Sequence, residues 1–188
     1  MENAKNTKNL TFKICISAVF IALGTVLSMF KPIEMPLGGG VTVMSMVPVA
    51  MMVLILGTKW GFIATFVYSL IQMGLSFVEV MGWGLTPTAL IATFLIDYIL
   101  AYTVLGFAGI FRKKGTVGIV LGVCLAVFLR FICHFITGGL IFDIWCEWDN
   151  AWWYSFCYNG AYMLPEMVIT AIATALVFKT PQIKRYIA

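Results

Sequence analysis

Long apolar stretches separated by short polar connections run through almost the whole chain. A helix that crosses a bilayer needs roughly 20 mostly apolar residues. Six segments meet or approach this length: about residues 11–30, 43–57, 61–80, 87–111, 116–142 and 151–178. The second is short, and only Gly57-Thr58-Lys59-Trp60 separates it from the third. The pattern predicts an all-α integral membrane protein with six transmembrane helices, forming one membrane domain over residues 1–188.

Composition and charge add an orientation to this picture. Of the 188 residues, 62% are hydrophobic and 11% are charged, far from the average of a soluble domain. Ten of the 12 basic residues lie in the terminal segments or in the second and fourth connections: Lys5, Lys8, Lys13, Lys59, Arg112, Lys113, Lys114, Lys179, Lys184 and Arg185. Cytoplasmic loops carry such an excess, so both termini are expected to be cytoplasmic. The bias also accounts for the net charge of +4, and no nucleic-acid partner is expected.

Ionisable side chains inside the apolar segments are costly unless they are paired or face a cavity. The chain has four: Asp97, Arg130, His134 and Glu166. Arg130 and His134 are four residues apart and therefore share a helix face. One interpretation is an Asp97–Arg130 ion pair that fixes the packing of the fourth and fifth helices. The other is that Asp97 and His134 face a polar ligand, and the residues alone leave both open.

The last segment carries a polar face. Ser155, Asn159, Tyr162 and Glu166 are spaced by 4, 3 and 4 residues, so they lie on one side of a helix. This spacing predicts a helix that lines a cavity. An interhelical hydrogen-bond ladder that holds the bundle together is the alternative. Pro165 is expected to interrupt backbone hydrogen bonds and to kink the helix.

Aromatic residues gather in the predicted external connections and nearby helix ends: Trp83, Phe142, Trp145, Trp148, Trp152, Trp153 and Tyr154. Most are expected to anchor the protein at the lipid headgroups, where Trp and Tyr are enriched. Aromatic walls together with a carboxylate also suit an organic cation. The residue types therefore favour a flat cationic heterocycle as ligand. No metal-ligand set accompanies the single histidine, so no metal or cofactor is expected.

Two features belong to the first segment and the connection after it. Ala18 and Ala22 form a small-xxx-small pair that lets another helix approach closely, and packing inside the same bundle is the favoured interpretation from the residues. Residues 35–40, Met-Pro-Leu-Gly-Gly-Gly, predict a flexible external connection suited to cover a pocket as a lid.

Four motifs give the chain a resemblance to a known family. They are Met35-Pro36-Leu37-Gly38-Gly39, Leu95-Ile96-Asp97-Tyr98, Cys133-His134-Phe135-Ile136-Thr137-Gly138 and Tyr154-Ser155-Phe156-Cys157-Tyr158-Asn159-Gly160. With its length, segments and charge distribution, the chain resembles the thiamin-specific substrate-binding (S) components of energy-coupling factor (ECF) transporters. The resemblance covers essentially the whole chain. It implies a multi-pass protein of a prokaryotic cell membrane that captures external thiamin and is not an enzyme.

The resemblance also implies site residues and partners. Thiamin would contact Asp97, Tyr98, His134, Phe142, Tyr154 and Asn159, with further lining from Trp83, Trp145, Tyr162 and Glu166. Asp97 would neutralise the thiazolium or bind the aminopyrimidine, and Phe142 would stack on a ring. Hydrogen bonds to the hydroxyl and the ring nitrogens would come from Tyr98, His134, Tyr154 and Asn159. Some members carry Trp where Phe142 stands, so Trp83 or Trp145 is an alternative stacking surface.

In this family the small residues of the first helix, here Ala18 and Ala22, meet a transmembrane coupling subunit whose two ATPase partners drive uptake. The chain itself has no Walker-type phosphate-binding loop, so it is not expected to hydrolyse ATP. Two other interpretations remain from the sequence. One is an S component for another vitamin or a thiamin precursor. The other is an intramembrane enzyme that uses His134 with Asp97 as acid and base.

Overall fold

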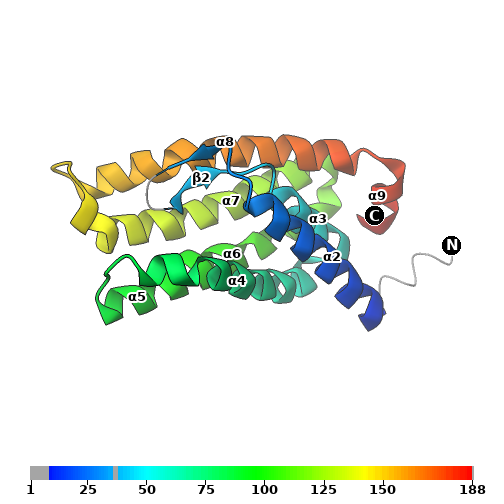
Figure 1. The fold of residues 1–188 in the computed structure, drawn as a ribbon. Helices are drawn as coiled ribbons and strands as arrows, with labels where there is room; N and C mark the ends of the chain where they lie inside the picture. The colour runs from blue at the N-terminus through cyan, green and yellow to red at the C-terminus, as the bar shows by residue number, and fades with distance from the viewer. Residues whose placement is uncertain (1–8, 36–37, 188) are drawn as a thin grey trace.

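The computed structural model describes residues 9–35 and 38–187, and Pro36 and Leu37 of the predicted lid lie outside the described residues. Helices dominate it, and Figure 1 shows them as an elongated bundle with the start of α2 and helix α9 at the same end. The elements are α2 (Leu10–Ser28), β1 (Ile33–Glu34), β2 (Gly40–Val41), α3 (Met46–Leu56), α4 (Thr58–Met81), α5 (Pro87–Thr93), the π-helix η2 (Phe94–Leu100), α6 (Ala101–Thr103), the 3₁₀ helices η3 (Val104–Gly109) and η4 (Arg112–Lys114), α7 (Gly115–Leu140), the 3₁₀ helix η5 (Phe142–Trp145), α8 (Ala151–Phe178) and α9 (Pro181–Ile187).

Five segments of the described chain are long and apolar enough to cross a bilayer: Leu10–Ser28, Thr58–Met81, Pro87–Gly109, Arg112–Leu140 and Ala151–Phe178. They confirm the prediction of an all-α integral membrane protein. The predicted second span, residues 43–57, contains only the 11-residue helix α3. This is shorter than the roughly 20 residues that a spanning helix needs.

The apolar character of α3 reflects the protein core rather than lipid. Val49, Met52, Val53 and Leu54 are all buried, and a helix that is apolar on every side is typical of such a position. The helix ends at Gly57, whose φ of 90° is a backbone conformation that glycine adopts readily. The next helix, α4, begins at once, so the chain turns back without a longer loop.

The fourth segment is helical but irregular. After α5, which Thr86 caps by accepting a hydrogen bond from the Ala89 N–H at 3.3 Å, the chain forms the π-helix η2, one turn of α6 and the 3₁₀ helix η3. Stretches of π-helix inside longer helices are frequently found at functional sites. Asp97 and Tyr98 both lie in η2.

Helices α7 and α8 approach each other closely at one end. A Cβ atom on Gly138 would lie 2.2 Å from the Ser155 Oγ, so a side chain larger than hydrogen does not fit there. This close approach brings the polar face of α8 against α7. The predicted face is confirmed, because Ser155, Asn159 and Glu166 are all buried toward the interior of the bundle.

The predicted flexible connection after α2 contains a short antiparallel hairpin. Strand β1 pairs with β2 in the register Ile33 with Val41 and Glu34 with Gly40. The Met35 N–H donates to the Gly39 carbonyl oxygen at 2.8 Å. Backbone pairing therefore orders both sides of this connection.

The outer face of α2 carries the predicted small-residue pair. Ala18 and Ala22 are exposed, whereas Ser17, Ile21 and Gly24 of the same helix are buried. The favoured interpretation that this pair packs inside the bundle is therefore wrong. The helix turns Gly24 toward its neighbours and leaves the two alanines on the surface.

Candidate binding site

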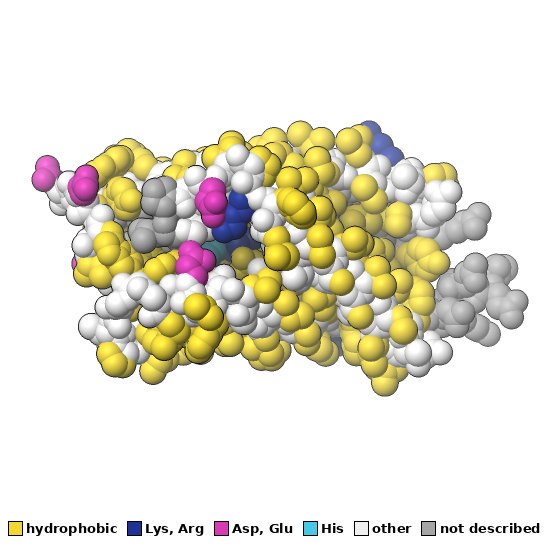
Figure 2. Space-filling view, in the orientation of Figure 1, with side chains coloured by type: hydrophobic (Ala, Val, Ile, Leu, Met, Phe, Trp, Pro, Cys, Tyr) yellow, Lys and Arg dark blue, Asp and Glu magenta, His cyan; other side chains and the backbone are white. Residues whose placement is uncertain are grey.

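A cavity of about 480 Å³ lies between α2, the hairpin, α4, the fourth segment, α7 and α8. This volume is typical of a site for a small organic molecule. Figure 2 shows that acidic and basic side chains gather around a hollow on a face that is otherwise largely hydrophobic. Charged side chains therefore border the cavity on a face that is otherwise largely apolar.

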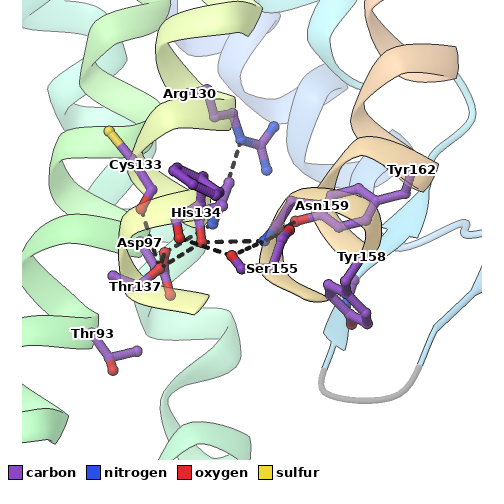
Figure 3. Close-up of polar contacts among 12 residues, drawn as sticks. Thr93, Asp97, Arg130, Cys133, His134, Thr137, Ser155, Tyr158, Asn159 and Tyr162 are labelled. Atoms are coloured by element: carbon purple, nitrogen blue, oxygen red, sulfur yellow. Dashed lines mark hydrogen bonds and ion pairs between the residues drawn. The ribbon is translucent and has the colours of Figure 1, made fainter. Parts of the chain in front are cut away.

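The wall of the cavity formed by η2 and α7 carries a chain of three ionisable groups (Figure 3). Asp97 is only 6% exposed, and its Oδ1 lies 2.9 Å from the His134 Nδ1. The Arg130 Nε–H donates to the His134 Nε2 at 3.3 Å, and its guanidinium lies over the Tyr102 ring at 4.2 Å. The Thr137 hydroxyl also donates to Asp97 Oδ1. The interpretation as a direct Asp97–Arg130 ion pair is therefore wrong, because His134 lies between the two groups.

The polar face of α8 is bonded both internally and to α7 (Figure 3). The Asn159 amide nitrogen donates to the backbone oxygens of Ser155 at 2.9 Å and His134 at 3.2 Å, and its Oδ1 accepts from the Tyr162 hydroxyl at 2.8 Å. The Ser155 hydroxyl donates to the Phe135 carbonyl oxygen at 2.8 Å. Both sequence interpretations of this face hold: it lines the cavity, and it ties α8 to α7.

Aromatic rings form the rest of the wall. Tyr154 and Tyr158 of α8 stack with ring centroids 5.9 Å apart, and Trp83 meets Phe142 edge to face at 5.6 Å. All four rings line the cavity. Ring faces beside a buried carboxylate suit a flat cation, because the negative face of the ring quadrupole attracts positive charge.

The hairpin connection closes one side of the cavity through bonds to α8. The Gly39 N–H donates to the Tyr158 hydroxyl at 3.2 Å. Thr42 donates twice to the Glu166 carboxylate, from its N–H at 2.8 Å and from its hydroxyl at 2.5 Å. Glu166 is only 1% exposed, so these bonds satisfy a carboxylate that is otherwise surrounded by protein.

The family model of the thiamine transporter protein (Thia_YuaJ) matches residues 14–185. The chain belongs to this family. The thiamine transporter ThiT of Bacillus subtilis (strain 168) is 29% identical over 193 residues, which cover 96% of this chain and 95% of that protein. The structure of ThiT from Listeria monocytogenes has the same fold, with a TM-score of 0.73 at 21% identity, over 94% of this chain and 97% of that one.

Membership in the thiamine transporter family settles the class of protein. The family is one of transport proteins, so the chain is a transport protein, and the interpretation as an intramembrane enzyme is rejected. With a bacterial relative and five apolar helices of spanning length in its described part, it is a multi-pass membrane protein of a prokaryote.

The structure of this thiamine transporter family member brings nearly all predicted site residues to one cavity. Asp97, Tyr98, His134, Phe142, Tyr154 and Asn159 all line it, and so do Trp83, Tyr162 and Glu166. Trp145 does not. Its ring instead stacks behind Phe142 at 5.7 Å and meets Trp83 at 6.3 Å, where it supports both lining rings. Contact of these residues with a ligand stays a prediction.

Several lining residues were missed by sequence reasoning. Gln72, Ser76 and Glu79 of α4 line the cavity, and their spacing of 4 and 3 residues is the same signal that marks α8. Tyr102 also lines it, one helical turn after Tyr98. Gln72 and Ser76 are neutral and Glu79 lies at the end of its apolar segment, so none of the three stands out as a charge deep within a span.

Proposed function

We propose that the chain is the thiamin-binding S component of an ECF-type vitamin uptake transporter, acting as one membrane domain. Its family and the name of its Bacillus relative support thiamin as the substrate. The observation that carries the assignment is the buried Asp97 carboxylate on the wall of a cavity lined by aromatic rings. Thiamin is built from two flat rings and carries a fixed positive charge on its thiazolium. A carboxylate in a dry site and aromatic ring faces are the groups that bind such a cation.

Roles for the site residues follow from their positions. Asp97 accepts the His134 and Thr137 donors at Oδ1, so its Oδ2 is available to the positively charged ring. Phe142 and Tyr154 supply ring faces for stacking. Asn159 uses both amide hydrogens within the protein, so its Oδ1 is the atom that accepts a ligand hydrogen bond.

The hairpin connection serves as a lid in this proposal. Its bonds from Gly39 to Tyr158 and from Thr42 to Glu166 reach across the cavity to α8. Closure by this connection separates the bound cation from water, which strengthens its attraction to Asp97. Thiamin entry requires the Gly39–Tyr158 contact to open.

The coupling subunit of the transporter binds the exposed Ala18–Ala22 face of α2. Small residues on a lipid-exposed helix allow a second helix to pack closely against it. The paired ATPases of the complex supply the energy. We assign both termini to the cytoplasm, in line with the basic residues of the terminal segments and of the second and fourth connections.

The binding role is tested by titrating the purified, detergent-solubilised protein with thiamin and following tryptophan fluorescence, since Trp83 lines the cavity. We expect saturable quenching that riboflavin and biotin do not reproduce. Asn159→Ala is expected to raise Kd at least about tenfold, because it removes a hydrogen bond to the ligand and the support of His134. Asn150→Ala is the matched control, because Asn150 caps α8 outside the cavity.

Three results are informative. Quenching by thiamin that Asn159→Ala weakens and Asn150→Ala preserves supports the proposal. A response to another vitamin in place of thiamin replaces the ligand. The absence of a response to every vitamin contradicts the binding role.

The coupling role needs a separate experiment. In vesicles that contain the coupling subunit and ATPases, Ala22→Trp is expected to abolish ATP-driven thiamin uptake while thiamin binding persists. Leu121→Trp is the control, because Leu121 is exposed on α7 rather than on α2. Equal uptake by the two variants would contradict a docking role for α2.

A further inference from the structure

Arg130 lines the same cavity as Asp97, although a positive charge there opposes the binding of a cation. Its guanidinium lies over the Tyr102 ring, and its Nε contacts the His134 Nε2 at 3.3 Å. Simple charge counting predicts that a thiamin site works better without Arg130. The hydrogen-bond directions at His134 lead to the opposite expectation.

The contact with Arg130 determines which nitrogen of His134 carries a proton. The Arg Nε always carries a hydrogen, so it is the donor, and the His134 Nε2 must accept. A ring nitrogen that accepts a hydrogen bond has no proton, so the imidazole is neutral and its one proton is on Nδ1. Nδ1 lies 2.9 Å from Asp97 Oδ1 and therefore donates to that carboxylate.

Neighbouring elements supply the remaining groups around this ring. Asp97 comes from η2, Arg130 and Thr137 from α7, and the Asn159 amide of α8 holds the His134 backbone oxygen. Other titratable groups on the lining of the cavity include Tyr98, Tyr102, Tyr162, Glu79 and Glu166. Tyr162 donates to Asn159, and Glu166 accepts from Thr42.

We infer that Arg130 is a positioning residue that holds His134 as the neutral Nδ1–H tautomer, so that Asp97 remains an anionic acceptor facing the ligand. The relevance to transport rests on the proposed thiamin-binding function. With His134 neutral, the charges of Arg130 and Asp97 balance. A doubly protonated His134 adds a positive charge beside Asp97 and repels the ligand. The other tautomer turns a lone pair toward the carboxylate, and the two repel each other.

The chain has only one histidine, so NMR of protein labelled with ¹⁵N-histidine reports on His134 alone. We expect a pyridine-type signal from Nε2 and a pyrrole-type signal from Nδ1. Arg130→Met is expected to change this pattern of nitrogen signals and to raise the thiamin Kd about tenfold, despite removing a positive charge.

Two further variants separate charge from hydrogen bonding. Lys31→Met removes a cation from the lining of the same cavity, and Lys31 contacts the Gly38 carbonyl oxygen and Glu34 rather than His134. It should leave the His134 spectrum unchanged. Arg130→Lys keeps a cationic donor and should partly restore both the spectrum and the affinity. Thermal unfolding in detergent checks that each variant is folded.

A wild-type spectrum with both nitrogens protonated, or with the proton on Nε2, overturns the inference, and so does an Arg130→Met spectrum identical to wild type. If Arg130→Met does not fold, the wild-type spectrum decides alone. The expected spectrum in a protein that does not bind thiamin would support the role of Arg130 and contradict the proposed function.

Discussion

Replacing Asp97 with asparagine separates the charge of this side chain from its shape. The asparagine Oδ1 can still accept from the His134 Nδ1–H and the Thr137 hydroxyl, as the carboxylate does. The side chain also keeps its size at a buried position. The main loss is therefore the negative charge on the cavity wall, so the variant should fold and unfold nearly as the wild type does.

The loss of affinity can be estimated from electrostatics. Two unit charges about 4 Å apart attract by about 4 kcal/mol at an effective dielectric constant of 20. Asp97 lies among packed helices, so this estimate applies better than the value in bulk water. A hydrogen bond to a charged group contributes about 1.5–3 kcal/mol. A loss of about 2–4 kcal/mol corresponds to a Kd about 30- to 1,000-fold higher.

A neutral ligand makes the experiment decisive. Calorimetric titrations would compare thiamin with an analogue in which an uncharged thiophene replaces the thiazolium, on wild type and Asp97→Asn. The coupling between side-chain charge and ligand charge should account for most of the lost affinity. Asp143→Asn is the matched control, since Asp143 is an exposed acid that does not line the cavity. Equal losses for the charged and neutral ligands would refute charge pairing by Asp97.

Three other substitutions test the surrounding structure. Gly138→Ala places a methyl group against Ser155, so it should lower the free energy of unfolding by about 1–3 kcal/mol and weaken thiamin binding. Thermal unfolding and thiamin titration measure the two effects, and unchanged binding would contradict the tight α7–α8 contact. Thr42→Val removes the hydroxyl bond to Glu166 and should speed thiamin release about tenfold in stopped-flow measurements, whereas an unchanged rate would argue against the lid. Arg112→Met removes the hydrogen-bond donors to the Leu54 and Ile55 carbonyl oxygens, so it should lower the Tm without changing the thiamin Kd. A changed Kd would show that this end of α3 influences the binding site.

Helix periodicity in the sequence located one wall of the cavity but not the others. Ser155, Asn159 and Glu166 stand out in α8 because polar residues at helical spacing in an apolar segment have few explanations. The hairpin contributes Gly39 and Thr42 by backbone and hydroxyl bonds across 119 and 124 residues of sequence. Contacts of this kind depend on the tertiary fold, and no local pattern predicts them.

Hydropathy alone does not distinguish lipid from protein as the apolar surroundings of a helix. Segment 43–57 is as apolar as a spanning helix, yet α3 is buried among other helices. The sequence offers one signal, the shortness of this segment, and the helix that forms in it is shorter still, with 11 residues. The same ambiguity affected Ala18 and Ala22, because small residues favour close packing against any helix. Only the structure shows that both face outward.

The polar groups of the cavity satisfy one another within the chain, which matters for how a ligand binds. Asp97 pairs with His134, Asn159 bonds Ser155 and His134, and Glu166 accepts from Thr42. An unpaired polar group at membrane depth costs several kcal/mol, so these bonds stabilise the bundle by themselves. A cation that approaches Asp97 Oδ2 need not break any of them. Binding should therefore leave α7 and α8 nearly fixed, and the structural change should be confined to the hairpin, whose contacts with α8 include the neutral hydrogen bond from Gly39 to Tyr158.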